Sequence, residues 1–137
     1  MANYKIEEIE GIGRAYGEKL RQAGVKSTEE ILKRACDRKG RQELAEVTGL
    51  DASLILTWVN MADLFRIKGI GAEYAELLKK SGVDTVKELR NRNPENLLAK
   101  MTEINSAGRQ LVRNMPSLKM VESWVTLAKE LDPMVTH

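Results

Sequence analysis

Two short glycine sequences, Gly11-Ile12-Gly13 and Gly69-Ile70-Gly71, are the part of this chain best suited to bind an anion. Glycine tolerates positive φ and has no side chain, so the backbone at these positions can approach another surface closely. If a helix begins directly after each second glycine, its first amide N–H groups lack partners within the helix, and the helix dipole favours a negative charge there. The chemistry predicted for both sequences is therefore binding of an anion, such as a phosphate, by backbone N–H groups.

Basic residues accompany the two glycine sequences unequally. Arg14 directly follows the first, and Lys68 directly precedes the second. The densest basic cluster lies elsewhere and consists of Lys33, Arg34, Arg38, Lys39 and Arg41. Such a cluster is typical of a phosphate-contacting patch, but cations are also favoured at a solvated helix C-terminus. The sequence leaves both interpretations open.

Acidic residues also lie close to each glycine sequence. Glu7, Glu8 and Glu10 precede the first, whereas Glu73 and Glu76 follow the second. A carboxylate on the first turn of a helix stabilises that helix but repels a phosphate at the same pole. If only one of the two sequences binds phosphate, we therefore expect it to be Gly11–Arg14.

The glycine sequences belong to an internal duplication. Residues 6–20 align without a gap with residues 64–78, which lie 58 positions later, and the match continues from Gly24-Val25 to Gly82-Val83. A duplication of this kind determines the architecture before any single residue is interpreted. An apolar pair, a Gly-apolar-Gly turn and a new helix together predict two short helices joined by a tight hairpin.

Helical spacing and helix boundary signals fill the rest of the chain, so we predict an all-α fold. Ser27 to Glu30 is typical of a capping box, Gly40 is expected to break the helix that follows, and Asn93-Pro94 is a strong helix start. The expected helices include residues 14–23, 44–47, 53–64 and a last one between Pro116 and Asp132.

Each half also contains a weaker copy of the hairpin. Residues 44–51 keep the apolar spacing but have Asp51 in place of the second glycine, and residues 98–105 lack both glycines. These copies are expected only to turn the chain. We predict four hairpins, two of them degenerate, in two halves that pack together, and the expected divisions are residues 1–62, 63–115 and a C-terminal helix packed on the second half in 116–137.

The glycine hairpin, with the pattern Gly-Val-x-(Ser/Thr)-x-x-Glu-(Leu/Ile) after its second helix, resembles the helix-hairpin-helix superfamily in its paired form. The tandem layout, including TWVNMADLFRIKGIGAEYAELL, is similar to a bacterial family of helix-hairpin-helix proteins with no established function. The resemblance implies two fused helix-hairpin-helix pairs whose hairpin amides contact DNA or RNA phosphates. Such contacts carry no base information and are weakened by salt.

Catalysis is not expected. The only histidine is His137, and the single cysteine, Cys36, has no histidine partner in the sequence, so neither a His-based dyad nor a His-rich or cysteine metal site can be assembled. We therefore expect a non-enzymatic binding module without cofactor, metal or small-molecule substrate. No apolar run is long enough to span a bilayer and the N-terminus does not resemble a signal peptide, so a cytoplasmic protein without a membrane partner is predicted.

An alternative function is a protein-interaction or self-association module. The formal net charge of the 137 residues is only +2, which favours this alternative, whereas the complete glycine hairpins favour nucleic acid. An apolar helix face within residues 118–131 is the expected docking surface. Trp58 and Trp124 lie on apolar helical stripes, and core packing is expected for them in preference to base stacking.

Overall fold

The computed structural model describes residues 3–137, which form α-helices and one short 3-10 helix and contain no β-strand. The predicted all-α fold is confirmed. Within these residues an antiparallel β-bridge joins Lys5 to Ser27. In chain order the elements are η1 (Ile6–Glu8), α1 (Arg14–Gln22), α2 (Thr28–Ala35), α3 (Arg38–Thr48), α4 (Ala52–Leu64), α5 (Ala72–Lys80), α6 (Val86–Leu89), α7 (Pro94–Ala107) and α8 (Leu118–Glu130).

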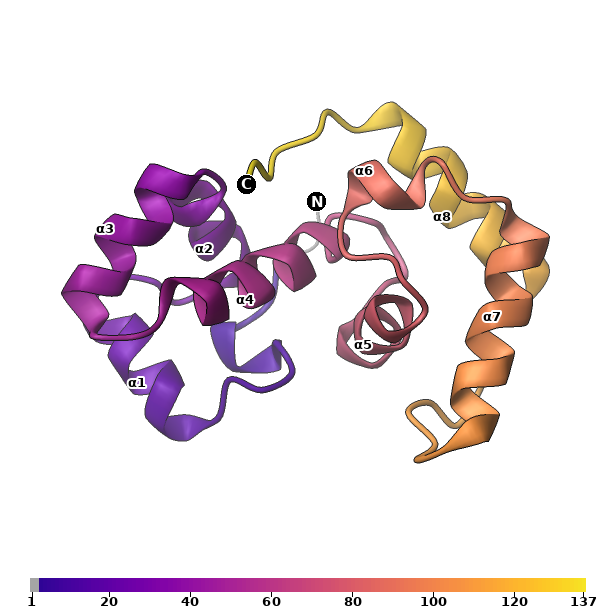
Figure 1. The fold of residues 1–137 in the computed structure, drawn as a ribbon, viewed down its shortest axis with the longest axis horizontal. Helices are drawn as coiled ribbons and strands as arrows, with labels where there is room; N and C mark the ends of the chain where they lie inside the picture. The colour runs from indigo at the N-terminus through magenta and orange to yellow at the C-terminus, as the bar shows by residue number, and fades with distance from the viewer. Residues whose placement is uncertain (1–2) are drawn as a thin grey trace.

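The duplication in the sequence is also a duplication in space. Helices α1 and α5 occupy equivalent positions of the alignment and both end just before a glycine with positive φ, Gly24 at +89° and Gly82 at +93°. In the first half α2 and α3 pack against α4, and in the second half α6 and α7 pack against α8 (Figure 1). Helix α8 therefore has the place in the second half that α4 has in the first.

The two halves share one hydrophobic core. Helix α4 packs against α2 and α3 at one end and against α5 at the other. The largest buried side chains are Trp58 and Trp124, 1% and 2% exposed, and Phe65, whose ring lies 5.3 Å from that of Tyr4. The predicted core packing of both tryptophans is confirmed.

The boundary between α2 and α3 differs from the prediction. Gly40 does not break a helix but lies in the first turn of α3, where its N–H donates to Asp37 Oδ1 at 2.7 Å. The chain turns at Asp37 because this carboxylate caps the new helix. A Cβ at Gly40 would lie 1.9 Å from the carbonyl oxygen of Arg34, so glycine is required here for the close approach of α2 and α3.

The two degenerate hairpins have different outcomes. The first is a true turn: Gly49 has φ +74°, Leu50 is buried, and Asp51 caps α4. The second, predicted within residues 98–105, is wrong, because α7 continues through it to Ala107. Without glycine at either turn position, nothing favours leaving the helical conformation there.

The turn between α7 and α8 comes later, in a loop of residues 108–117. The side chain of Asn105 holds this loop. Its Oδ1 accepts hydrogen bonds from the amides of Leu111 and Val112, at 2.8 and 3.1 Å, and its Nδ2 donates to the carbonyl of Val112 at 3.1 Å. The second half thus reverses its chain by a loop where the first half uses a glycine turn.

Candidate functional site

The first glycine turn leaves the start of α1 without a side-chain cap. Gly11 has φ +91°, and the amide of the buried Ile12 donates to the carbonyl of Ile9 at 3.1 Å. Gly13 is the N-cap residue, and the first bond within α1 runs from Gly17 N to Gly13 O at 2.9 Å. The amides of the intervening residues 14–16 precede that bond and point out of the helix pole.

The second glycine turn repeats this geometry. Gly69 has φ +97°, the amide of the buried Ile70 donates to Ile67 O at 3.1 Å, and Gly71 caps α5 without a side-chain hydrogen bond. In both turns the isoleucine side chain belongs to the core. The contribution of Ile12 and Ile70 to any surface contact is therefore limited to their backbone.

The other helices in residues 3–137 begin differently. At α6, Asp63 accepts from the Val86 amide at 2.8 Å. The remaining α-helices have their own capping side chain, a serine, aspartate or asparagine: Ser27 for α2, Asp37 for α3, Asp51 for α4, Asn93 for α7 and Ser117 for α8. Among the α-helices of residues 3–137, only α1 and α5 thus begin without any first-turn amide bonded to a side-chain oxygen.

Each glycine turn rests on a tryptophan. A Cβ on Gly11 would lie 4.0 Å from Trp58 Nε1, and a Cβ on Gly69 would lie 3.1 Å from Trp124 Nε1. The third residue of each helix packs on the same indole, with ring centroids 5.3 Å apart for Tyr16 and 5.2 Å for Tyr74. The tryptophans, which come from α4 and α8, hold the turns from beneath and leave the amides facing outward.

The acidic surroundings of the first turn are partly neutralised. Glu7 makes two hydrogen bonds with the guanidinium of Arg21, at 2.7 and 2.6 Å. The hydrogen bonds from Arg21 lower the pKa of Glu7 to about 2. Gly17 provides the room, because a Cβ there would lie 2.7 Å from Glu7 Oε2. Arg14, whose side chain is 94% exposed, pairs loosely with Glu18 at 3.5 Å and is free to turn toward a ligand.

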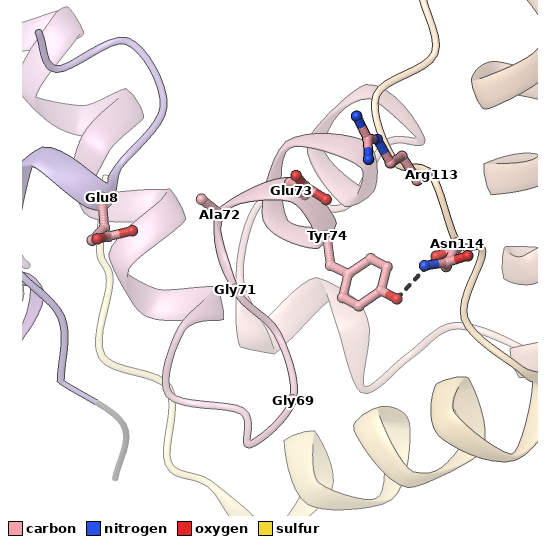
Figure 2. A pocket seen from close by; sticks show the side chains of 8 residues that line it. All are labelled: Glu8, Gly69, Gly71, Ala72, Glu73, Tyr74, Arg113 and Asn114. Carbon is pink, nitrogen blue, oxygen red and sulfur yellow. Dashed lines mark hydrogen bonds between the residues drawn. The ribbon is translucent and has the colours of Figure 1, made fainter.

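The second turn opens into a shallow pocket of about 530 Å³. Figure 2 shows Glu8 from η1 on one side of this pocket and Arg113 from the 108–117 loop on the other. Glu73 also lines it, and Tyr74 closes the base by donating its hydroxyl to the carbonyl of Asn114 at 3.0 Å. The charges around this turn are therefore mixed, although Lys68 next to it is exposed.

Part of the basic cluster predicted at residues 33–41 lies away from the first glycine turn. Arg34 donates to the carbonyl of Ala23, which follows the C-terminus of α1. Since α1 has nine residues, this end is about 13 Å from the turn. Arg92, at the equivalent position of the second half, donates to Ser81 O at 3.4 Å. These two arginines therefore bind carbonyls at helix ends, which the favourable placement of cations there explains.

The other members of the cluster fall into two groups. Arg41 is only 4% exposed, and its Nη1 donates to the carbonyls of Ala35 and Cys36 at 3.1 and 3.0 Å. It was predicted as part of a surface patch and is instead buried. Lys33 pairs with Glu29 at 3.0 Å, and the side chains of Lys33, Arg38 and Lys39 are exposed.

The sequence did not identify two neighbours of the second turn, Trp124 and Arg113. The position of Trp124 relative to Gly69 differs from that of Trp58 relative to Gly11 because of the 108–117 loop, so the alignment does not superimpose them. The available signal was that Tyr16 and Tyr74 occupy equivalent positions of the duplication, so both should pack on a similar partner.

Comparison with known proteins identifies a family. The sequence model of the family described as Domain of unknown function (DUF4332) matches residues 10–131, whereas no curated protein and no solved structure matches. Within residues 3–137 no helix has both the length and the apolar character needed to cross a membrane. The matched region contains both glycine turns and all eight α-helices, and the chain belongs to the DUF4332 family.

Proposed function

We propose that this protein is a non-enzymatic module that binds the phosphate backbone of nucleic acid, with DNA as the first candidate, through helix-hairpin-helix elements at its two glycine turns. The proposal is supported by a difference in how the α-helices are capped at their N-termini. Five of the α-helices in residues 3–137 begin with their own capping side chain, whereas α1 and α5 begin at Gly13 and Gly71 with none. Uncapped amides at a helix pole are the groups that a phosphate oxygen can accept from.

The proposed contact is independent of base sequence. Amides of residues 14–16 at the first turn and 72–74 at the second would donate to phosphate oxygens, and Arg14 and Lys68 would add charge. Contacts of this kind position a protein on the backbone without reading the bases, and they release counterions, so affinity falls as salt rises. The exposed Arg38 and Lys39 belong to a separate surface that a long duplex could reach.

The two turns are proposed to contribute unequally. At the first turn, Arg21 neutralises Glu7, and the exposed Arg14 directly follows the capping glycine. At the second turn, Glu8 and Glu73 line the same pocket as the amides, and only Arg113 opposes them there. The first turn is therefore the stronger candidate.

The alternative is a protein-interaction or self-association module that does not bind nucleic acid. The docking face expected within residues 118–131 is not free, because its apolar side chains Val121, Trp124, Val125 and Ala128 are buried in the core. The net charge of +2 still favours this alternative, as does Val47, an apolar side chain 65% exposed beside the Gly49 turn. Light scattering during size-exclusion chromatography measures self-association directly. A stable dimer that binds no DNA would favour this alternative.

The test of the proposed function is an anisotropy titration of labelled duplex and single-stranded DNA over a salt series. We expect a Kd below about 10 μM at low salt, no dependence on base sequence, and a steep loss of affinity as salt increases. Absence of binding at the lowest salt concentration would refute the proposal. Binding that is insensitive to salt would also contradict it, because phosphate contacts by amides and cations release counterions.

A further inference from the structure

The seven residues after α8 connect the second half back to the first. Figure 1 shows this segment, residues 131–137, running from the end of α8 toward α2. Near its start, Arg66 Nη2 donates to the carbonyl of Asp132 at 2.8 Å. Near its other end, the amide of Thr136 donates to the carbonyl of Cys36 at 2.8 Å. We call residues 131–137 the return segment.

The return segment covers one member of the basic cluster. Arg41 Nη2 donates to the carbonyl of Thr136 at 2.6 Å, which completes a set of three carbonyl acceptors around this guanidinium. Burial lowers the pKa of Arg41, although its neighbour Asp37 acts in the opposite direction. Beside it lies an open pocket of about 270 Å³, lined also by Arg38 and by His137 of the return segment. Arg41 is thus a buried cation next to a surface pocket. The return segment is part of what shields its guanidinium from water.

The return segment is held weakly compared with the helices. It contains no helix or strand, its hydrogen bonds to the first half run through the backbone of Thr136, and Met134 and Val135 are only partly buried against the core. Segments with few buried apolar contacts open at a lower free energy than the core. The return segment can therefore detach while the helices beneath it stay folded.

We propose that the return segment is a releasable strap that masks Arg41, and that a nucleic-acid phosphate displaces it. Hydrogen bonds between a guanidinium and a phosphate are charge-assisted and stronger than those between a guanidinium and a neutral carbonyl. Release lets Arg41 join the exposed Arg38 and Lys39 in one basic surface. This inference rests on the proposed function for the identity of the displacing ligand, but the masking itself is tested separately.

Three variants distinguish release of the return segment from a general loss of structure. A chain shortened to end at Pro133 loses Met, Val, Thr and His, so its formal net charge, counted at pH 7 with neutral histidine, is unchanged. Thr136→Pro keeps the full length but removes the amide that donates to Cys36. Thr136→Ala is the matched control, because both contacts of Thr136 use its backbone and its side chain is exposed.

The first measurement is the reaction rate of Cys36, the only thiol in the chain, with a neutral disulfide reagent. The side chain of Cys36 is half-buried and its carbonyl accepts from the amide of Thr136, so we expect a severalfold faster reaction in the shortened chain and in Thr136→Pro, and no change in Thr136→Ala. Equal rates in all variants would show that the segment does not cover this region, and would overturn the proposal.

The second measurement is the salt series with duplex DNA. Exposure of Arg41 predicts at least about a threefold lower Kd at low salt and a slope steeper by about one unit in the shortened chain. A faster thiol reaction with unchanged DNA affinity and slope would mean that the segment is only structural. If no variant binds DNA, the proposed function fails, and elution from a cation-exchange resin then decides the masking. Later elution of the shortened chain supports it, and identical elution overturns it.

Discussion

The glycine turn at residues 11–13 and its copy at residues 69–71 share their backbone but differ in the side chains around them. Their first glycines have φ +91° and +97°, and both second glycines cap a nine-residue helix. The first turn has the Glu7–Arg21 pair fitted against Gly17. In the second, Phe65, Lys79 and Ala75 occupy the equivalent positions, and Phe65 and Ala75 are buried.

The backbone conformation of the turns and the side chains around them therefore have separate origins. Positive φ is required of the glycines whatever surrounds them, so both turns keep glycine. The side chains that flank each helix are held by packing instead, and packing accepts an ion pair fitted against a glycine in the first half and a buried phenylalanine and a buried alanine in the second.

The halves also differ in how they hold α2 and α6, the helices that follow α1 and α5. In the first half the amide of Thr28 donates to the carbonyl of Tyr4, whereas at the equivalent position Val86 donates to the buried carboxylate of Asp63. Asp63, 1% exposed, also pairs with Arg66 at 2.8 Å. We expect Asp63→Ala to cost about 3 kcal/mol of unfolding free energy, because it removes the acceptor of a helix amide and the carboxylate partner of a buried guanidinium, which keeps only the carbonyl of Asp132.

The position equivalent to Asp63 in the first half is Lys5, an exposed residue. Lys5→Ala is thus the matched control and should cost less than about 0.5 kcal/mol. Urea unfolding measures both. Similar losses for the two variants would show that the carboxylate has no special part in holding α6.

The turns themselves differ in how closely their tryptophans approach. Gly69→Ala combines a positive φ with a Cβ 3.1 Å from Trp124 Nε1, whereas Gly11→Ala has the same backbone strain and a contact at 4.0 Å. We expect losses of about 2 and about 1 kcal/mol of unfolding free energy, respectively. Thermal and urea unfolding provide the comparison, and a larger loss for Gly11→Ala would reverse the order of packing inferred from the structure.

Substitution at the capping glycines compares the turns as binding sites. Gly13 and Gly71 have negative φ and open space where a Cβ would lie, so aspartate fits at both. Its carboxylate would cap the helix, as Asp51 does at the start of α4, and would exclude a phosphate. We expect Gly13→Asp to weaken DNA binding about tenfold, or about 1.4 kcal/mol, and Gly71→Asp to weaken it by less.

Both variants should unfold at the same or a slightly higher temperature than the parent protein, since an aspartate cap is slightly better than glycine. Gly108→Asp, at an exposed glycine outside the turns, adds the same charge and should have the smallest effect on DNA affinity. If all three variants bind equally well, the site lies elsewhere. If Gly71→Asp has the larger effect, the order of the two turns is wrong.

The smallest expected effect concerns pH. Because Arg21 lowers the pKa of Glu7 from 4.5 to about 2, the folded state gains stability from the ionised carboxylate above pH 4.5 and loses it as the pH falls toward 2. Glu7→Gln removes this contribution, so the difference in stability between parent and variant should shrink on acidification over that window. Both side chains are 38% exposed, and solvent screening keeps the effect small.

Thermal unfolding between pH 2 and pH 6 measures this difference in stability between the parent protein and Glu7→Gln. Glu10→Gln, which removes one charge from the same region without touching the Arg21 pair, is the control. A constant difference between the parent and Glu7→Gln over the whole range would mean that the ion pair does not form in solution.

The features that the sequence predicted correctly are local ones. The glycine turns, the caps at Ser27 and Asn93 and the apolar stripes of Trp58 and Trp124 follow from residue types and spacing, and all are present in the structure. The all-α fold could be predicted because these signals recur along most of the chain.

What escaped prediction depends on contacts between distant residues. Arg41 lies in a basic stretch of sequence, which predicts a surface position. It is buried instead, and the carbonyl of Thr136, 95 positions away, supplies one of its hydrogen-bond acceptors. The cap that Asp63 gives to α6 spans 23 positions. Arg34 is an instructive case, since its repetition at Arg92 could have indicated a structural role shared by both halves.

The uncapped starts of α1 and α5 also connect ligand binding with folding. A helix that begins at glycine forgoes the stability of a side-chain cap, and any anion held by its first amides supplies that stability from outside. A ligand that binds only the folded chain raises the unfolding free energy by RT ln(1 + [L]/Kd). The melting temperature of this protein should therefore report occupancy of the turns for any polyanion, and Gly13→Asp should lose part of that response because it already contains its own anion.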